Sequence, residues 1–353
     1  MTNDLRKDIC RKSKRGNMSV PLKPKFSFLH LLVTVAFITF FSVPAHAQVI
    51  TASLDPTQPV IMPAAAAWRE ALVIGGSYLE QTGTRTLNEQ QIYQFEGSGF
   101  SANAVFQISN FFIDGYASQI KTDVKIDQYY PAGGVINLAH SDNRLNIALA
   151  GNDFVTIGLG ARLVDSTDYF DPTFDSATTS QMRTIGSISI KAMEFLYFGI
   201  GYERVREGND FAVDLNWNNL LGGLGVKLGE AGSTRFRAEY SFAFSPRTEN
   251  EVQGDLLPAK HNETMTHRLG MELMFSGLLF AFNGKQTNID LSSVAAPPGV
   301  VLPDKMSKSR TSGGVLWIPD EGLMLGFYFA NDTTTFSFKD ERSEFRINLG
   351  YLF

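Results

Sequence analysis

The chain has 353 residues, of which 44% are hydrophobic and 31 are glycine, and its formal net charge at pH 7 is −5. This length accommodates one large β domain or two ordinary domains. Cys10 is the only cysteine, so the rest of the chain has no disulfide, no cysteine nucleophile and no cysteine-ligated metal site. The acidic balance gives no indication of a nucleic-acid partner.

Residues 1–47 are predicted to be a cleaved secretory signal peptide. Lys23 and Lys25 precede an apolar run from about residue 31 to residue 41, and Ala45-His46-Ala47 supplies a small-x-small cleavage site. The run is too short to span a bilayer, which takes about 20 apolar residues; an uncleaved anchor is the alternative. Met18 is a possible true start, because the residues before it include six Lys/Arg and no apolar run.

Cleavage after Ala47 would change the charge balance. Residues 1–47 contain eight basic and two acidic residues, so the mature chain would keep 31 − 8 = 23 basic and 36 − 2 = 34 acidic residues, a formal charge of −11. Residues 48–69 follow as a Pro-rich and then Ala-rich segment, "LDPTQPVIMPAAAAWRE". We expect this segment to start in the periplasm, ahead of the first strand.

Segments of about ten residues with alternating hydrophobicity recur from residue 70 to residue 353. They predict fourteen strands, at about 70–81, 97–108, 110–122, 143–150, 153–165, 183–192, 194–205, 217–229, 233–245, 264–275, 278–288, 309–318, 321–331 and 343–353. Short turns and long polar loops alternate between them. An even number of such strands, with short turns at one rim and long loops at the other, is typical of an antiparallel transmembrane β-barrel of the outer membrane.

The last predicted strand, "EFRINLGYLF", ends on an aromatic residue. Phe345, Ile347, Leu349, Tyr351 and Phe353 share one face, which we expect to meet lipid. This ending resembles the C-terminal β-signal of bacterial outer-membrane proteins, an alternating final strand that ends in phenylalanine. The resemblance implies that Tyr351 and Phe353 are read by the barrel-assembly machinery. A secreted β-sandwich is the alternative.

The opposite faces of the strands predict a charged lumen that leans positive. They place nine basic and five acidic side chains inward: Arg144, Arg162, Lys191, Lys227, Arg235, Arg237, Arg268, Lys285 and Arg346, with Asp114, Glu203, Glu239, Glu272 and Glu344. The densest group comprises Arg235, Arg237 and Glu239 on one strand, with Arg268 and Glu272 on its neighbour. Either these residues form ion pairs that stiffen the barrel, or they form a ladder that orders permeating anions.

Other inward positions are small or apolar, as in "TIGLGARL" and "LLGGLGVKLG". A plain water-filled porin would be more uniformly polar inside, so the lumen is expected to pack against a plug or to bind an apolar ligand. The glycine runs lack the spacing and the following helix of a nucleotide-binding loop. Glycine is expected there to give room or curvature to a strand.

A fourteen-stranded barrel preceded by a Pro-Ala segment resembles the long-chain fatty-acid transporter family of outer-membrane proteins. Its N-terminal hatch carries an Asn-Pro-Ala motif, which Pro63-Ala64-Ala65 matches here in part, with Met62 at the Asn position. The resemblance implies that residues 48–69 plug the barrel. It also implies passage of hydrophobic small molecules that enter from the loop side.

These observations favour an outer-membrane channel or transporter of a Gram-negative bacterium, for passive passage of small or hydrophobic solutes. A structural or surface-interaction barrel with a closed lumen is the alternative. A lipid-modifying enzyme is a third class, but His140, His261 and His267 show no triad spacing, so no catalytic residue is predicted. The expected partners are outer-membrane lipid and lipopolysaccharide, the assembly machinery and the solute. No cofactor or metal site is expected.

Overall fold

The computed structural model describes residues 53–55, 58–69, 72–87, 89–126, 134–169, 177–209, 214–229, 234–250, 259–292, 303–319, 321–336 and 339–353. The chain divides into two units, residues 1–37 and 38–353, and every described residue belongs to the second. The predicted signal peptide therefore lies outside the described residues. Among the described residues, no helix is long and apolar enough to cross a membrane.

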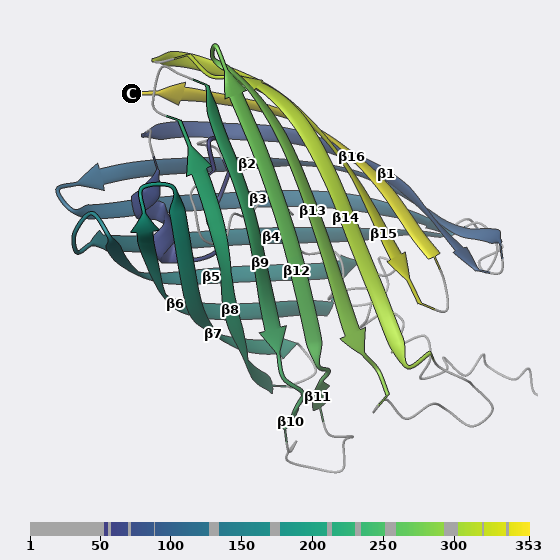
Figure 1. Ribbon diagram of the computed structural model, residues 1–353. Coiled ribbons are helices and arrows are strands. Elements are labelled where there is room, and N and C mark those ends of the chain that lie inside the picture. The colour runs from purple at the N-terminus through teal and green to yellow at the C-terminus, as the bar shows by residue number, and fades with distance from the viewer. Residues whose placement is uncertain are drawn as a thin grey trace, which may run out of the picture. The chain divides into compact units, whose positions relative to one another are not determined.

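Fourteen antiparallel strands form one closed barrel (Figure 1). In chain order these strands are β1 (Val73–Leu87), β2 (Gln90–Ile108), β3 (Phe111–Ile126), β4 (Gly134–Ala150), β5 (Val155–Tyr169), β6 (Ala177–Met193), β7 (Leu196–Asn209), β8 (Asp214–Leu228), β9 (Arg235–Ser245), β12 (Thr264–Phe275), β13 (Leu278–Asp290), β14 (Lys305–Trp317), β15 (Gly322–Thr335) and β16 (Lys339–Leu352). Each strand pairs with its sequence neighbour in the barrel, and β1 closes the ring against β16. The prediction of a fourteen-stranded all-β barrel is confirmed.

The two rims of the barrel differ in how well the sequence predicted them. At one rim, the turn end, short links such as Ser109-Asn110 and Ser276-Gly277 join the strands where expected. At the other rim, the loop end, most strands run further than predicted; β1 and β2 extend through the expected loop 82–96 and are separated by only two residues. A small extra sheet, β10 (Thr248–Asn250) with β11 (Ala259–His261), lies within the expected loop 246–263.

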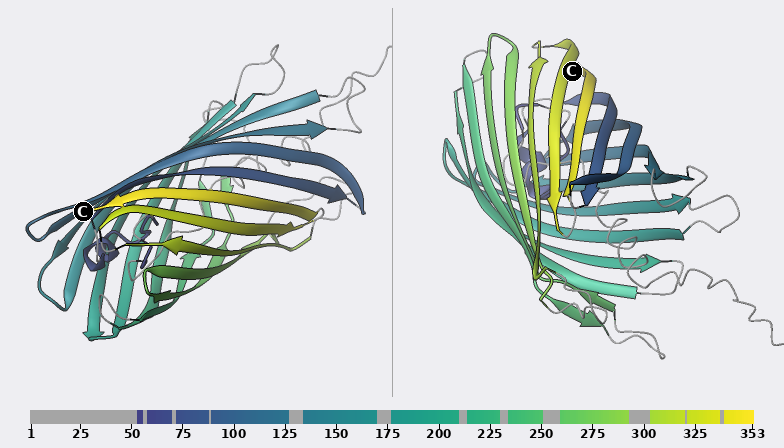
Figure 2. Two further views of the ribbon diagram at one scale, coloured as in Figure 1. Left: turned by 90° about the horizontal axis from the view of Figure 1, so that it is seen from above. Right: turned by 90° about the vertical axis from the view of Figure 1, so that its right-hand side faces the viewer.

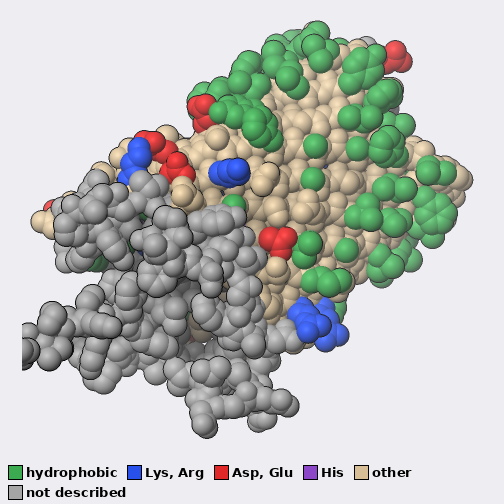
Figure 3. Space-filling view, turned by 180° about the vertical axis from the view of Figure 1, so that it is seen from behind, with side chains coloured by type: hydrophobic (Ala, Val, Ile, Leu, Met, Phe, Trp, Pro, Cys, Tyr) green, Lys and Arg blue, Asp and Glu red, His purple; other side chains and the backbone are tan. Residues whose placement is uncertain are grey.

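The outer face of the barrel is apolar. Side chains such as Leu159 and Phe329, which are 69% and 63% exposed, alternate along the strands with buried neighbours. Figure 3 shows hydrophobic side chains along the upper edge and the right-hand side of the visible wall, with few charged side chains among them. Since a closed barrel also pairs its strands without a free edge, this surface fits a hydrocarbon environment.

The inner face is polar toward the loop end and more apolar toward the turn end. Figure 2 shows the only described helix of the chain, the 3₁₀ helix η1 (Pro63–Trp68), within the ring of strands near the end that holds the C-terminus. The start of β1 lies beside that terminus, because the Phe353 amide donates to the Leu72 carbonyl at 3.3 Å. The segment that precedes β1 therefore enters the barrel from the turn end.

Candidate functional site

The described part of the N-terminal segment, residues 53–55 and 58–69, lies inside the barrel near the turn end and contacts the inner wall. Val60, Met62 and Ala64–Ala66 are buried. Met62 packs with Ile185, Tyr197 and Leu221 of the barrel wall. The Asn position of the family motif thus holds an apolar side chain in an apolar pocket of the wall.

Helix η1 is fixed to the wall by hydrogen bonds as well as by packing. The Ala64 amide donates to Ser187 Oγ at 2.9 Å, and Thr156 Oγ1 donates to the Ala64 carbonyl at 2.9 Å. Trp68 Nε1 donates to Ser189 Oγ at 2.9 Å. These partners lie on β5 and β6, so serine and threonine on adjacent strands satisfy the polar groups of a helix too short to satisfy its own.

Two glycines of β5 make the space that η1 occupies. A Cβ atom on Gly158 would collide with the backbone of Pro63 and Ala64, and one on Gly160 would lie 2.7 Å from Pro63 Cγ. Any larger residue would push the helix away from the strand. The glycines of "TIGLGARL" therefore provide room for the segment.

Residues 53–55 contact the opposite wall. Ser53 Oγ donates to Glu272 Oε1 at 2.5 Å, and the Leu54 amide donates to Glu272 Oε2 at 2.8 Å. Tyr328 hydroxyl donates to Asp55 Oδ2 at 2.8 Å. The segment therefore spans the lumen from β5 and β6 to β12 and β15.

A buried ion pair holds the end of the segment next to β1. Arg69 Nη2 lies 3.0 Å from Asp114 Oδ2 of β3, and both side chains are almost fully buried. Lys227 Nζ lies 3.5 Å from the Trp68 carbonyl. Removal of one partner of such a pair would leave an uncompensated charge in the lumen.

A layer of ion pairs lies above the segment, toward the loop end. On one wall, Asp142 accepts hydrogen bonds from Arg144 Nη2 at 2.6 Å and from Arg162 Nε at 2.7 Å. On the opposite wall, Arg310 Nη1 lies 2.5 Å from Asp332 Oδ2 and Nη2 lies 3.1 Å from Glu344 Oε2. These contacts cross-link neighbouring strands from the inside.

The predicted lumen residues lie on the inner face but not in one cluster. Arg237 Nη2 binds Glu239 at 2.6 Å, and Arg237 Nη1 lies 3.5 Å from Glu272. Arg346 binds Glu344 at 2.9 Å. Of the two interpretations, ion pairing describes the Arg235–Arg237–Glu239 strand better than an anion ladder, since Glu272 also binds the N-terminal segment. Arg268 lies nearer the loop end of β12 than Glu272 does, and it forms no ion pair with a described residue.

Several inward charges escaped the sequence analysis. Asp142, Asp332, Asp340 and Arg85 were assigned to loops, yet all lie on strands, and Arg85 binds Asp340 through Nε at 2.5 Å. Their strands continue beyond the apolar belt. Both faces of a strand are polar there, so alternating hydrophobicity does not reveal the strand. Arg183 could have been predicted to face inward. It lies an even number of residues from Lys191 on β6, so both side chains share one face, and Lys191 was predicted to face inward.

One histidine-serine contact has the chemistry to be considered for catalysis. His140 Nδ1 and Ser166 Oγ lie 3.0 Å apart on the inner face. The nearby Asp142 carboxylate is already bound by two arginines, so it does not orient the imidazole as the acid of a triad does. Within the described ranges, no group of His, Cys, Asp and Glu is arranged to hold a metal ion.

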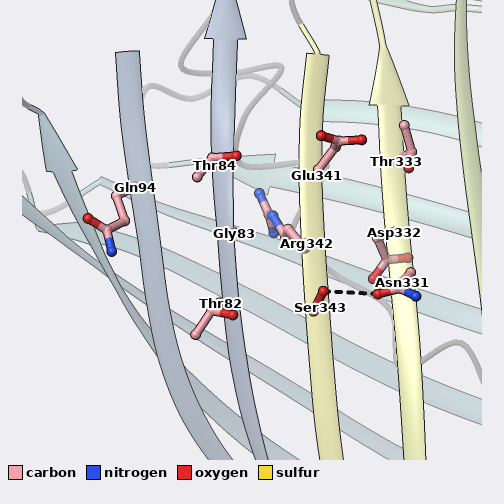
Figure 4. A pocket seen from close by; sticks show the side chains of 10 residues that line it. All are labelled: Thr82, Gly83, Thr84, Gln94, Asn331, Asp332, Thr333, Glu341, Arg342 and Ser343. Atoms are coloured by element: carbon pink, nitrogen blue, oxygen red, sulfur yellow. Dashed lines mark hydrogen bonds between the residues drawn. The ribbon is translucent and has the colours of Figure 1, made fainter. Parts of the chain in front are cut away.

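A separate polar pocket of about 520 Å³ lies across β1, β2, β15 and β16 toward the loop end (Figure 4). It is lined by Thr82, Gly83, Thr84, Gln94, Asn331, Asp332, Thr333, Glu341, Arg342 and Ser343. Ser343 Oγ donates to Asn331 Oδ1 at 2.9 Å. Most of these side chains have the outward parity of Phe329, so the pocket is a depression of the wall and not part of the lumen.

Comparison with known proteins shows that solved hydrocarbon channels share the fold of this barrel. No family model and no curated protein sequence matches the chain. Solved structures do. The CymD monoaromatic hydrocarbon channel is 11% identical, with 83% of this chain and 91% of that chain covered and a TM-score of 0.52. The P. putida toluene transporter TodX is 8% identical, with 83% and 92% covered and a TM-score of 0.51.

A Pseudomonas aeruginosa FadL homologue is 9% identical, with 86% of this chain and 96% of that chain covered and a TM-score of 0.54. The chain has the fold of this channel family. The resemblance to the fatty-acid transporter family is thus confirmed at the level of the fold. The match covers nearly the whole length of each of these channels.

Proposed function

We propose that the protein is an outer-membrane channel for passive passage of small hydrophobic solutes, with residues 53–69 as an internal plug. The observation that carries the proposal is the N-terminal segment bound inside a closed barrel of the hydrocarbon-channel fold. The apolar outer face supports a location in the outer membrane, and the titles of the similar structures support hydrophobic solutes. Export directed by a signal peptide at residues 1–47, which is then removed, would bring the chain to the envelope.

A disulfide across the Ala64–Ser187 contact tests the plug. In a Cys10→Ser background, Ala64→Cys with Ser187→Cys places two cysteines at neighbouring residues, because the Ala64 backbone amide lies 2.9 Å from Ser187 Oγ. A disulfide between them requires Cβ atoms about 3.5–4.5 Å apart. We expect cells that produce the oxidised protein to take up radiolabelled naphthalene more slowly than cells treated with a reductant. Ala64→Cys alone is the control, and its uptake should not respond to the reductant.

The outcomes separate the competing functions. Equal uptake in the oxidised and reduced states would show that the segment does not gate passage, although the channel would stand. Uptake no faster than in cells without the protein, in either state, would favour a structural barrel with a closed lumen. The dense ion-pair layer above the segment is the feature that would suit that second function.

A further inference from the structure

The polar pocket in the wall is built by two rows of side chains that the strand register aligns (Figure 4). In the first row, Ser343 of β16 is the register partner of Thr82 of β1 and of Asn331 of β15. The second row lies two residues nearer the loop end and consists of Gln94, Thr84, Glu341 and Thr333. The pocket volume of about 520 Å³ falls in the range of ligand sites, about 300–1,000 Å³.

Aromatic side chains border this pocket on its turn-end side. Phe329 and Phe345 are register partners one outward position from the first row, and their ring centroids lie 5.0 Å apart. On the neighbouring strands, Tyr78 and Phe100 are partners with centroids 5.1 Å apart. Aromatic girdles of membrane barrels lie at the boundary between hydrocarbon and headgroups. The pocket therefore begins where the apolar belt ends.

The position of the pocket also indicates which leaflet it meets. It lies toward the loop end, and the long loops of outer-membrane barrels face the outside of the cell. The outer leaflet of that membrane consists largely of lipopolysaccharide, whose phosphorylated saccharide headgroup lies directly above its acyl chains. A molecule of this kind would place its chains against the aromatic side chains and its headgroup in the pocket.

The groups that line the pocket suit sugar hydroxyls. Hydroxyl and amide side chains both donate and accept hydrogen bonds, and the Glu341 carboxylate accepts them. The three threonines of the two rows form no hydrogen bond through their side chains with a described residue. Among the lining residues the one cation is Arg342, which has inward parity and lies over the Phe95 ring at 4.6 Å. The outward side chains of the pocket thus favour a neutral polar group over a phosphate.

Lysines lie at two edges of the pocket, where phosphates of the headgroup would meet them. Lys339 is the next outward residue of β16 beyond Glu341, and the two side chains form an ion pair at 2.6 Å. Lys125 of β3 is the register partner of Gln94 and pairs with Glu96 at 2.8 Å. All four charged side chains are about half exposed, and such exposed pairs contribute little to stability. Both amines can therefore turn to a phosphate at small cost.

We propose that this pocket binds the saccharide headgroup of one lipopolysaccharide molecule of the outer leaflet. The inference rests on the outer-membrane location in the proposed function and goes beyond it, since the ligand belongs to the membrane and is not the transported solute. The two rows bind sugar hydroxyls, Lys125 and Lys339 bind phosphates, and the acyl chains lie along the aromatic side chains. The bound lipid covers the β1–β16 pair that closes the ring.

Native mass spectrometry of the protein, refolded in detergent free of lipopolysaccharide, tests the site. Deep-rough lipopolysaccharide and phosphatidylethanolamine are added in equal amounts, and their masses identify the bound lipid. We expect one lipopolysaccharide molecule per barrel, in preference to the phospholipid, which has a phosphate but no sugar. Asn331→Ala with Ser343→Ala should reduce its affinity about tenfold, because hydrogen bonds to the headgroup are lost.

Gln286→Ala with Asn288→Ala is the matched control. Both residues are exposed amides with outward parity near the loop end of β13, and neither lines the pocket. This variant should bind lipopolysaccharide as the unaltered protein does.

Other results would overturn the inference. Unchanged affinity in the pocket variant, or an equal loss in the β13 variant, would show that the headgroup does not bind here. Equal occupancy by phosphatidylethanolamine would mean that the wall does not recognise a saccharide. A lipid-free dimer that the pocket variant loses would make this surface a contact between two copies of the chain.

Naphthalene uptake separates the two proposals, because the pocket lies outside the lumen and the pocket variant should keep its uptake. Normal uptake without binding of lipopolysaccharide would remove only this inference. Binding of lipopolysaccharide without uptake would remove only the channel.

Discussion

At the scale of single residues, Gly158 and Gly160 decide where the N-terminal segment lies. The hydrogen bonds of Ala64 to β5 and β6 require the helix backbone to approach β5 more closely than any side chain would permit. The position of the segment therefore depends on the lack of side chains at Gly158 and Gly160 as much as on the sequence of the segment itself.

Gly158→Val should displace the segment. The added methyl groups overlap the Pro63 and Ala64 backbone, and overpacking of this kind costs about 1–3 kcal/mol. We expect limited proteolysis to cut the segment faster in this variant while the barrel itself remains resistant. Gly284→Ala on β13, where a Cβ meets nothing within 4 Å, is the control. An unchanged cleavage rate in Gly158→Val would contradict the proposed packing.

The residue scale also shows what sequence reasoning could supply. Parity alone placed Arg144, Arg162 and Arg268 on the inner face. It could not show that Asp142 sits between two of them, because that carboxylate lies on the part of β4 that continues beyond the predicted strand. Cross-strand partners depend on register, which a single strand pattern does not contain.

At the scale of elements, each of the fourteen strands was found where alternation predicted it, and the largest errors lie at the loop-end termini. β4 begins at Gly134 although alternation was evident only from residue 143, and β6 begins at Ala177 although it was expected from residue 183. Inside the membrane, lipid requires an apolar residue at every second position. Beyond it both faces of a strand are wet, so the backbone pairs without that pattern.

Leu159→Arg tests the assignment of faces on β5. Leu159 is 69% exposed on the outer wall, and arginine on the lipid face near the midplane costs about 2–4 kcal/mol. Ser118→Arg on β3 should cost less, because Ser118 faces the polar lumen and not the lipid. Urea unfolding in lipid vesicles should give the larger loss of stability for Leu159→Arg. Equal losses would mean that the faces are assigned wrongly.

At the scale of the whole molecule, the barrel is a ring that encloses a separate segment. β1 and β16 pair from Val73–Leu352 to Thr86–Lys339, so the seam is as continuous as any other strand pair. The fold could be predicted because the sequence has an even number of segments with alternating hydrophobicity, and short turns alternate with long loops between them. Both features are typical of a closed barrel. The ion-pair layer of the lumen could not, because its partners are set by the register between neighbouring strands.

Phe353→Ser should impair assembly in the cell but not stability after refolding. The Phe353 ring is 64% exposed and contacts Tyr351 at a centroid distance of 5.1 Å, so its removal takes little from the folded barrel. We expect less heat-modifiable protein in the outer membrane, with an unfolding midpoint in vitro close to that of the unaltered chain. Normal membrane yield would show that the terminal aromatic residue is not read as an assembly signal.

A ring with an unbroken seam has no structurally privileged first strand, so it should tolerate circular permutation. The barrel's natural ends already meet at the Phe353–Leu72 hydrogen bond, where a short linker would join them. Opening the chain at the Ser276-Gly277 turn would make β12 the last strand, and this strand carries Leu269, Met271, Leu273 and Phe275 along its outer face. The permuted chain would again finish on an alternating strand that ends in phenylalanine, and the barrel would reach the same closed ring from a different starting point.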